Sequence, residues 1–332
     1  MQVPLLDIKD LSLHFKVFGG LLKVLDEVNF MVKFKEKVGL VGETGCGKTT
    51  TMKAIMRILD KTSTGISKGE ILLKGRNVLK MSEAKIQDVR RKEISMIFQD
   101  STAALNPFFS IGSQMRNILK YAGRMERKLT KEEIKFRSIE ALREVMLADP
   151  ERILESYPIQ LSGGMRQRVC IAMALLSDLV LLVADEPGTS LDVTVKDQIL
   201  RLLDSLVKEK NISIILVSHA LGMVKNLTER TYVMYAGSMV EVANTTELFV
   251  NPLHPYSQAL IATVPKLTGE GLSQGIPGRI PEYLTPPPGC RFHPRCNYVM
   301  PLCKVEKPPF FKVKTAHQVA CWLFKEKGGG VC

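Results

Sequence analysis

Apolar and polar residues alternate in short runs over residues 5–36, a period of two that is typical of antiparallel strands. Two further short strands between turns are predicted at residues 69–75 and 94–98, and a hairpin at residues 231–242. Other runs are apolar without alternation, which indicates strands buried on both faces. These runs cover residues 38–41, 180–184 and 212–217.

Helical spacing of apolar residues follows the first and second of these buried strands, and a third helix is predicted to begin at Met165. Alternation of strands and helices favours an α/β fold with a parallel sheet. Between residues 105 and 148 the chain becomes charged and keeps apolar residues three and four apart. This pattern predicts a helical insert, which we place at about residues 104–165.

Prolines become frequent after Asn251, and this change of composition predicts a domain boundary near residue 245. We therefore expect an N-terminal domain over residues 1–245 and a smaller C-terminal domain over residues 246–332.

The composition suits a protein with two such units: of 332 residues, 45% are hydrophobic and 24% are charged. The net charge of +12 is spread along the chain, which favours a solvated surface over a nucleic-acid or anionic membrane site. No apolar run approaches the ~18 residues that a membrane span needs. Asp7, Lys9 and Asp10 interrupt the apolar N-terminus, so no signal peptide is expected. These features predict a cytosolic protein.

The segment from Gly42 to Thr49 fits G-x-x-x-x-G-K-[ST], the phosphate-binding loop, between a predicted strand and a predicted helix. Glycines let the backbone approach a polyphosphate, and the N–H groups at the helix start attract anions. Lys48 would reach the β- and γ-phosphates, and Thr49 would bind Mg²⁺. The candidate nucleotide-binding residues of this segment are Gly42, Glu43, Thr44, Gly45, Cys46, Gly47, Lys48, Thr49 and Thr50.

Other predicted strands also end in polar residues, namely Gln99, the pair Asp185 and Glu186, and His219. Because ligands of open parallel sheets bind outside the carboxyl ends of the strands, we expect one nucleotide site there. Asp185 is placed to hold Mg²⁺ through water. Glu186 suits polarising the water that attacks the γ-phosphate.

The run Leu161-Ser162-Gly163-Gly164-Met165-Arg166-Gln167-Arg168 resembles the signature of ATP-binding cassette (ABC) proteins. The chain resembles that family at five further motifs in the same order: the phosphate loop, the Q-loop Gln99, the Walker B residues Asp185 and Glu186, the D-loop Ser190-Leu191-Asp192 and the switch His219. The resemblance implies a P-loop NTPase nucleotide-binding domain with a RecA-like core, an antiparallel β subdomain and a helical insert.

The resemblance also implies ATP and Mg²⁺ as ligands, with Thr49, Gln99 and Asp185 on the metal and Glu186, Gln99 and His219 in catalysis. It implies two cassettes stacked head to tail, so that one contacts the phosphates bound by the other. The contacting residues would be Ser162, Gly163, Gly164 and Asp192. An aromatic residue before the loop would stack on adenine; Phe15 is the first candidate and Phe18 the alternative.

The segments from Asn251 to Ser257 and from Gly289 to Cys296 resemble the tail of oligopeptide and dipeptide importer ATPases. This resemblance implies an ATPase subunit that drives peptide uptake from the cytoplasmic face of the membrane as a peripheral protein. The signature with Met165 resembles that of the first of two paired, non-identical ATPases. The implied partners are a sister ATPase, two permeases and, indirectly, a solute-binding protein; a homodimer is possible in isolation, and no nucleic acid is expected.

Four cysteines of the tail are spaced C-x5-C-x6-C-x17-C: Cys290, Cys296, Cys303 and Cys321. Thiolates are soft ligands that suit an iron–sulfur cluster or zinc. The resemblance to peptide importers implies a [4Fe–4S] cluster, with zinc and free thiols as alternatives.

The chain departs from the family pattern at Ala220, at Gly188-Thr189 and at Ile159, none of which binds phosphate or metal. Within importers, metal chelates and oligosaccharides are alternative substrates. A different class of function, a soluble ABC-type ATPase that acts on nucleic acid, is kept open by the net charge of +12.

Overall fold

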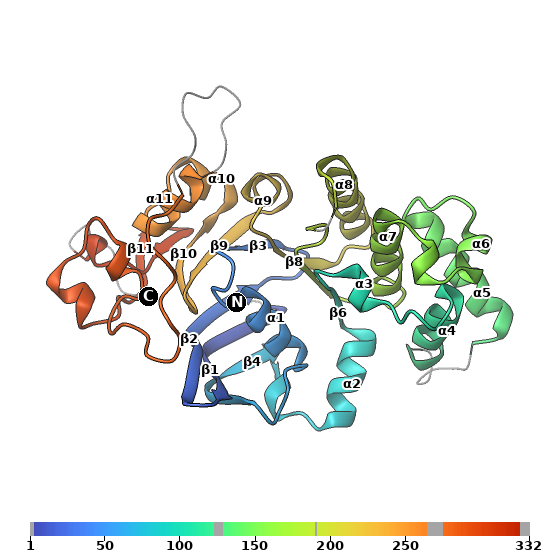
Figure 1. Cartoon of the computed structure of the whole chain (residues 1–332), viewed down its shortest axis with the longest axis horizontal. Helices are drawn as coiled ribbons and strands as arrows, with labels where there is room; N and C mark the ends of the chain where they lie inside the picture. The colour runs from blue at the N-terminus through green and yellow to red at the C-terminus, as the bar shows by residue number, and fades with distance from the viewer. Residues whose placement is uncertain (1–2, 123–128, 190, 264–274, 326–332) are drawn as a thin grey trace. The chain divides into compact units, whose positions relative to one another are not determined.

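The computed structural model describes residues 3–122, 129–189, 191–263 and 275–325. The chain divides into two compact units, one formed by residues 1–80 with 216–332 and the other by residues 81–215. Figure 1 labels most of their helices and strands.

The first unit contains an antiparallel sheet whose strands are ordered β2-β1-β4-β5. Strands β1 (Leu6–Val17) and β2 (Gly20–Val32) form a long hairpin with pairs such as Ile8↔Phe30. Strand β4 (Thr64–Leu73) pairs with the other edge of β1, and β5 (Arg76–Asn77) pairs with β4. The alternation over residues 5–36 therefore predicted antiparallel strands correctly.

A second sheet in this unit contains β3 (Lys37–Val41), which runs parallel to β9 (Arg230–Tyr235). Strand β10 (Ser238–Asn244) completes the predicted hairpin with β9. Beyond β10 the tail adds two short antiparallel strands, β12 (His317–Val319) and β11 (Phe311–Lys314). The sequence did not predict these tail strands, because three or four residues with charged neighbours carry no clear alternation.

The helices of the first unit are short, and several of them lie after β10 (Figure 1). Helix α1 follows β3, α9 precedes β9, and α10 and α11 follow β10. Their bounds are α1 Lys48–Met56, α9 Leu221–Leu227, α10 Thr245–Val250 and α11 Pro255–Ala262; the 3₁₀ helices are Val78–Lys80, His293–Arg295, Pro301–Lys304 and Trp322–Phe324.

The second unit is mainly helical around a parallel pair of strands, β6 (Ile94–Ile97) and β7 (Leu181–Asp185). Strand β8 (Ser213–Val217) begins in this unit and ends in the first. The helices are α2 Glu83–Lys92, α3 Ser101–Ala104, α4 Ile111–Ala122, α5 Lys131–Glu144, α6 Pro150–Glu155, α7 Gly163–Ala174 and α8 Val193–Glu209, with a 3₁₀ helix at Pro158–Gln160. Helices α4, α5 and α6 lie in the segment predicted as the helical insert.

Among the described residues, no helix is both long and apolar enough to cross a bilayer. The division into domains of residues 1–245 and 246–332 remains a prediction. In the structure, the tail pairs with β10 and belongs to the first compact unit.

Candidate nucleotide site

The phosphate loop joins the buried strand β3 to α1 and depends on glycine for its shape. Gly42 and Gly47 have φ angles of 154° and 108°, in the region that favours glycine. A Cβ on Gly42 would lie only 2.2 Å from the carbonyl oxygen of Met234. The backbone of this loop therefore follows its curved path only because these residues lack a side chain.

Lys48 lies inside the loop with 5% of its surface exposed. Its Nζ donates hydrogen bonds to the carbonyl oxygens of Gly42 at 2.8 Å and Glu43 at 3.0 Å. A buried ammonium surrounded by loop backbone forms a positive cradle for an anion. Burial raises the pKa of the Cys46 thiol, so this residue packs as a neutral side chain. Thr49 and Thr50 are half-buried in the first turn of α1.

Two other predicted site residues belong to the same unit. His219 lies exposed two residues beyond β8, next to Ser218, whose N–H donates to the carbonyl oxygen of Leu40 in β3 at 3.3 Å. Phe15 is half-buried in β1, whereas Phe18 is fully exposed in the turn between β1 and β2. The choice between them for adenine stacking remains a prediction.

In the second unit the structure brings Gln99 and Glu186 together. Gln99 Nε2 donates to Glu186 Oε2 at 3.0 Å, and Thr189 Oγ1 donates to the same oxygen at 3.0 Å. Glu186 has a φ of 49°, a left-handed conformation that is unusual for a residue with a side chain. Asp185, at the end of β7, is only 2% exposed.

Ser162 is the N-cap of α7, and its side chain accepts a hydrogen bond from the N–H of Met165 at 3.3 Å. A Cβ on Gly164 would lie 3.0 Å from Val195 Cγ1, so a small residue lets α7 approach α8 closely. Asp192 caps α8 by accepting from the Val195 N–H at 2.9 Å. Ser190, the first residue of the predicted D-loop, lies outside the described residues.

Three tail side chains contact the phosphate loop, and sequence reasoning missed all of them. Arg295 binds both carboxylate oxygens of Glu43, Tyr256 Oη accepts from the Glu43 N–H, and Tyr283 Oη donates to the Gly45 carbonyl oxygen. Their neighbours in the sequence give no signal for such contacts, because more than 200 residues separate each pair.

Comparison with known proteins agrees with these features. The ABC transporter family profile matches residues 25–189, and the profile of the oligopeptide/dipeptide transporter C-terminal region matches residues 240–303. A probable peptide ABC transporter ATP-binding protein of Sinorhizobium fredii is 42% identical over 324 residues, which cover 97% of this chain and 96% of that protein. The oligopeptide transport ATP-binding protein OppD of Bacillus subtilis is 42% identical over 321 residues, covering 96% of this chain and 88% of OppD.

The chain belongs to the ATP-binding proteins of the oligopeptide and dipeptide ABC transporters. The dipeptide transport ATP-binding protein DppD of Bacillus subtilis is a further relative, 38% identical over 319 residues that cover 96% of this chain and 94% of DppD.

Solved structures confirm the predicted ABC fold. A dimeric ATP-binding cassette bound to ADP and phosphate matches with a TM-score of 0.64 and 24% identity, covering 72% of this chain and 98% of that one. CbiO1 of Clostridium perfringens, part of an ABC transporter complex, matches with a TM-score of 0.62 and 26% identity, covering 75% and 91%.

The tail of this ABC ATPase gathers four thiols around one small pocket: Cys290, Cys296, Cys303 and Cys321. Burial raises the pKa of Cys290 to about 11 and that of Cys321 to about 12. Within the part of the chain that the structure describes, no three His, Cys, Asp or Glu side chains are arranged to hold a metal ion. The thiols therefore share a pocket without forming a ready-made metal site.

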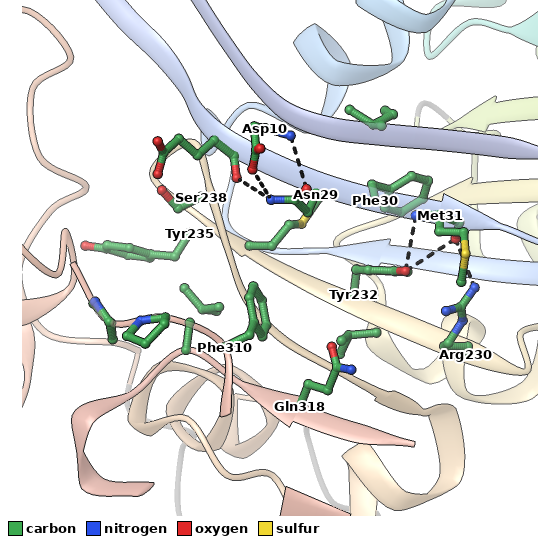
Figure 2. Close-up of a pocket in the computed structure, with 18 of the residues that line it drawn as sticks. Asp10, Asn29, Phe30, Met31, Arg230, Tyr232, Tyr235, Ser238, Phe310 and Gln318 are labelled. Atoms are coloured by element: carbon green, nitrogen blue, oxygen red, sulfur yellow. Dashed lines mark hydrogen bonds between the residues drawn. The ribbon is translucent and has the colours of Figure 1, made fainter. Parts of the chain in front are cut away.

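A cavity of about 820 Å³ lies in the first unit, between two sheets and the tail (Figure 2). Strands β1, β2, β9 and β10 line it together with tail residues such as Phe310. On its walls Asp10 and Asn29 form hydrogen bonds with each other, and Tyr232 Oη forms hydrogen bonds with the backbone of Met31. Among the described residues that line it, none belongs to the phosphate loop, so this cavity is not the nucleotide site.

Proposed function

We propose that this protein binds and hydrolyses ATP to drive the import of di- or oligopeptides. The phosphate loop with its buried Lys48 carries the proposal, because it is a formed anion cradle. Its relatives are named for peptide, oligopeptide and dipeptide transport, and the similarity extends through the tail.

In this proposal Lys48 binds the β- and γ-phosphates, and the loop N–H groups hold the remaining phosphate oxygens. Thr49, Gln99 and Asp185 supply hydroxyl, amide and carboxylate oxygens, the hard donors that Mg²⁺ prefers. The metal supplies charge neutralisation between the phosphates when it is bound.

Glu186 is proposed as the general base that takes a proton from the attacking water. Its carboxylate is already oriented by Gln99 and Thr189, so little reorganisation is needed before reaction. His219 is proposed to contact the γ-phosphate side of the nucleotide.

A second cassette is proposed to complete the site. Ser162, Gly163 and Gly164 open α7, and the N-terminus of a helix attracts phosphate oxygens. Asp192 would lie beside them at the same dimer contact. ATP then holds two cassettes together, and hydrolysis releases them.

The proposed partners are a sister ATPase, two permeases and, indirectly, a solute-binding protein, with this subunit at the cytoplasmic face of the membrane. Met165 in the signature favours the first position of an unlike pair. Copurification tests the pairing: a transporter that contains two copies of this chain and no sister ATPase would refute it.

An apolar surface of the second unit suits the contact with a permease. Phe108 is 85% exposed and Ile159 is 84% exposed, with Phe109 and Tyr157 also exposed. The two segments adjoin, because the N–H of Ile111 donates to the Ser156 carbonyl oxygen at 2.9 Å. Exposed apolar groups that cluster in this way mark interaction sites.

Replacing Phe108 and Ile159 together with alanine should uncouple transport from hydrolysis. We expect basal ATPase activity of the isolated subunit to be unchanged, whereas peptide uptake by the assembled transporter should fall about tenfold, since central apolar anchors dominate such contacts. Val250→Ala, at an exposed position of α10, is the control. Normal uptake in the double variant would reject this surface as the coupling site.

We also propose that the four tail thiols bind a [4Fe–4S] cluster, with zinc as the alternative. The support is the donor set alone: four soft sulfur ligands line one pocket, and cluster binding would have to bring them into the arrangement that a metal requires, which the described residues do not show. Cys290, Cys296, Cys303 and Cys321 would hold the cluster, which would link separate segments of the tail.

Anaerobic purification should then yield brown protein that contains iron and inorganic sulfide. Cys303→Ser should lose the colour and lower the thermal midpoint, whereas Cys170→Ser, at a half-buried cysteine of α7 outside the tail, should keep the colour. Stoichiometric zinc without iron in the wild-type protein would contradict the cluster.

The function as a whole is tested with the transporter assembled in membrane vesicles. Its ATPase activity should rise when the solute-binding protein is supplied with peptides. If metal chelates or oligosaccharides stimulate the ATPase and peptides do not, peptides are not the transported substrate. Salt-sensitive binding of nucleic acid by the isolated chain would favour a soluble ATPase that acts on nucleic acid.

A further inference from the structure

We propose that the C-terminal tail positions the phosphate loop through Glu43, so that Arg295 sets the affinity for nucleotide. The inference rests on the proposed function in one respect, namely that this loop binds ATP. It assigns to the tail a role in nucleotide binding by the same chain.

The central contact is a bidentate ion pair. Arg295 Nη1 lies 2.9 Å from Glu43 Oε2, and Arg295 Nη2 lies 3.1 Å from Glu43 Oε1. The Arg295 side chain is only 4% exposed. The Glu43 side chain is 27% exposed, so solvent reaches the pair from the side of the carboxylate. A bidentate guanidinium–carboxylate pair fixes direction as well as distance.

The tail itself holds Arg295 in place. Its guanidinium also donates to the carbonyl oxygens of Pro277 at 2.7 Å and Ile276 at 3.0 Å, and its Cζ lies 5.7 Å from the centre of the Tyr235 ring. Two carbonyl oxygens of the tail and one ring of β9 therefore orient this side chain in addition to Glu43, so its position does not depend on the loop alone.

Two tyrosines of the tail contact the backbone of the phosphate loop, one at Glu43 and one at Gly45. The Glu43 N–H donates to Tyr256 Oη at 2.8 Å, and Tyr283 Oη donates to the Gly45 carbonyl oxygen at 2.7 Å. Tyr256 is fully buried against the rings of Tyr235 and Phe292. The tail thus holds the loop at two backbone positions and one side chain.

These contacts act on nucleotide affinity in two ways. A loop held in its binding conformation loses less entropy when phosphate arrives. Arg295 also balances the charge of Glu43, a carboxylate within a loop that must accept a polyanion. If Arg295 is removed, that carboxylate is left to repel the triphosphate.

The test measures ATP binding and steady-state kinetics of the full-length protein. Arg295→Ala should raise the Kd and KM for ATP about tenfold or more, as expected for the loss of charge-assisted hydrogen bonds, with kcat at saturating ATP nearly unchanged. Arg295→Lys should recover part of the affinity. Adding Glu43→Gln to Arg295→Ala should also recover affinity, because the unpaired charge is gone.

Lys314→Ala is the matched control, since it breaks another ion pair of the tail, with Glu247, away from the phosphate loop. If Arg295→Ala does not fold, Tyr283→Phe, which removes only the bond to Gly45, should raise the KM and serves as the deciding variant. Wild-type affinity in a folded Arg295→Ala or in Tyr283→Phe overturns the inference. Absence of ATP binding by the wild-type protein would instead reject the proposed function.

Discussion

Replacing Glu186 with glutamine is expected to abolish ATP turnover while leaving ATP binding intact. Glutamine keeps the size of the side chain and can still accept from Gln99 and Thr189, but it cannot take a proton from water. Loss of a general base lowers the rate by about 100-fold or more. Phosphate release over time and binding of a fluorescent ATP analogue measure the two properties separately.

The same variant should accumulate as a dimer when ATP and Mg²⁺ are present, because the nucleotide that joins two cassettes is no longer consumed. Size-exclusion chromatography with and without ATP detects this change. Glu209→Gln, at the exposed end of α8, is the control and should behave as wild type. Hydrolysis at the normal rate by Glu186→Gln would mean that another group activates the water.

Replacing Lys48 with alanine is expected to weaken ATP binding itself. The Nζ atom is the positive charge of the proposed cradle, and its hydrogen bonds to two loop carbonyl oxygens hold it inside the loop. Loss of charge-assisted hydrogen bonds predicts an increase in Kd of about tenfold to 100-fold. Calorimetric titration with ATP measures it.

Lys53→Ala, which removes the same charge from the last turn of the same helix, is the control. Both variants should melt within a few degrees of wild type if the loop keeps its fold. Unchanged ATP affinity in Lys48→Ala would contradict the assignment of the phosphate loop.

The cassette motifs were predictable because each is a local pattern. The apolar run before Gly42 and the helical spacing after Lys48 predicted strand, loop and helix, and β3 and α1 confirm the order. The helix predicted to begin at Met165 begins two residues earlier, at Gly163, with Ser162 as its N-cap.

The tail was less predictable because its contacts are distant in sequence. Arg295 and Glu43 are 252 residues apart, and nothing near either one indicates the other. Strand β12 contains three residues and forms by pairing with β10, so its conformation follows from tertiary contacts rather than from local pattern. The four tail cysteines were expected to share one site, and they line one pocket.

Ser162 has its proposed role only when a second chain is present, and this makes the closed dimer the central claim. A structure of the Glu186→Gln protein with its sister subunit, ATP and Mg²⁺ tests it most directly. The account predicts that Ser162 Oγ of one subunit lies within hydrogen-bond distance of the γ-phosphate whose other side contacts Lys48 of the opposite subunit. A closed assembly in which Ser162 is far from every phosphate would contradict it.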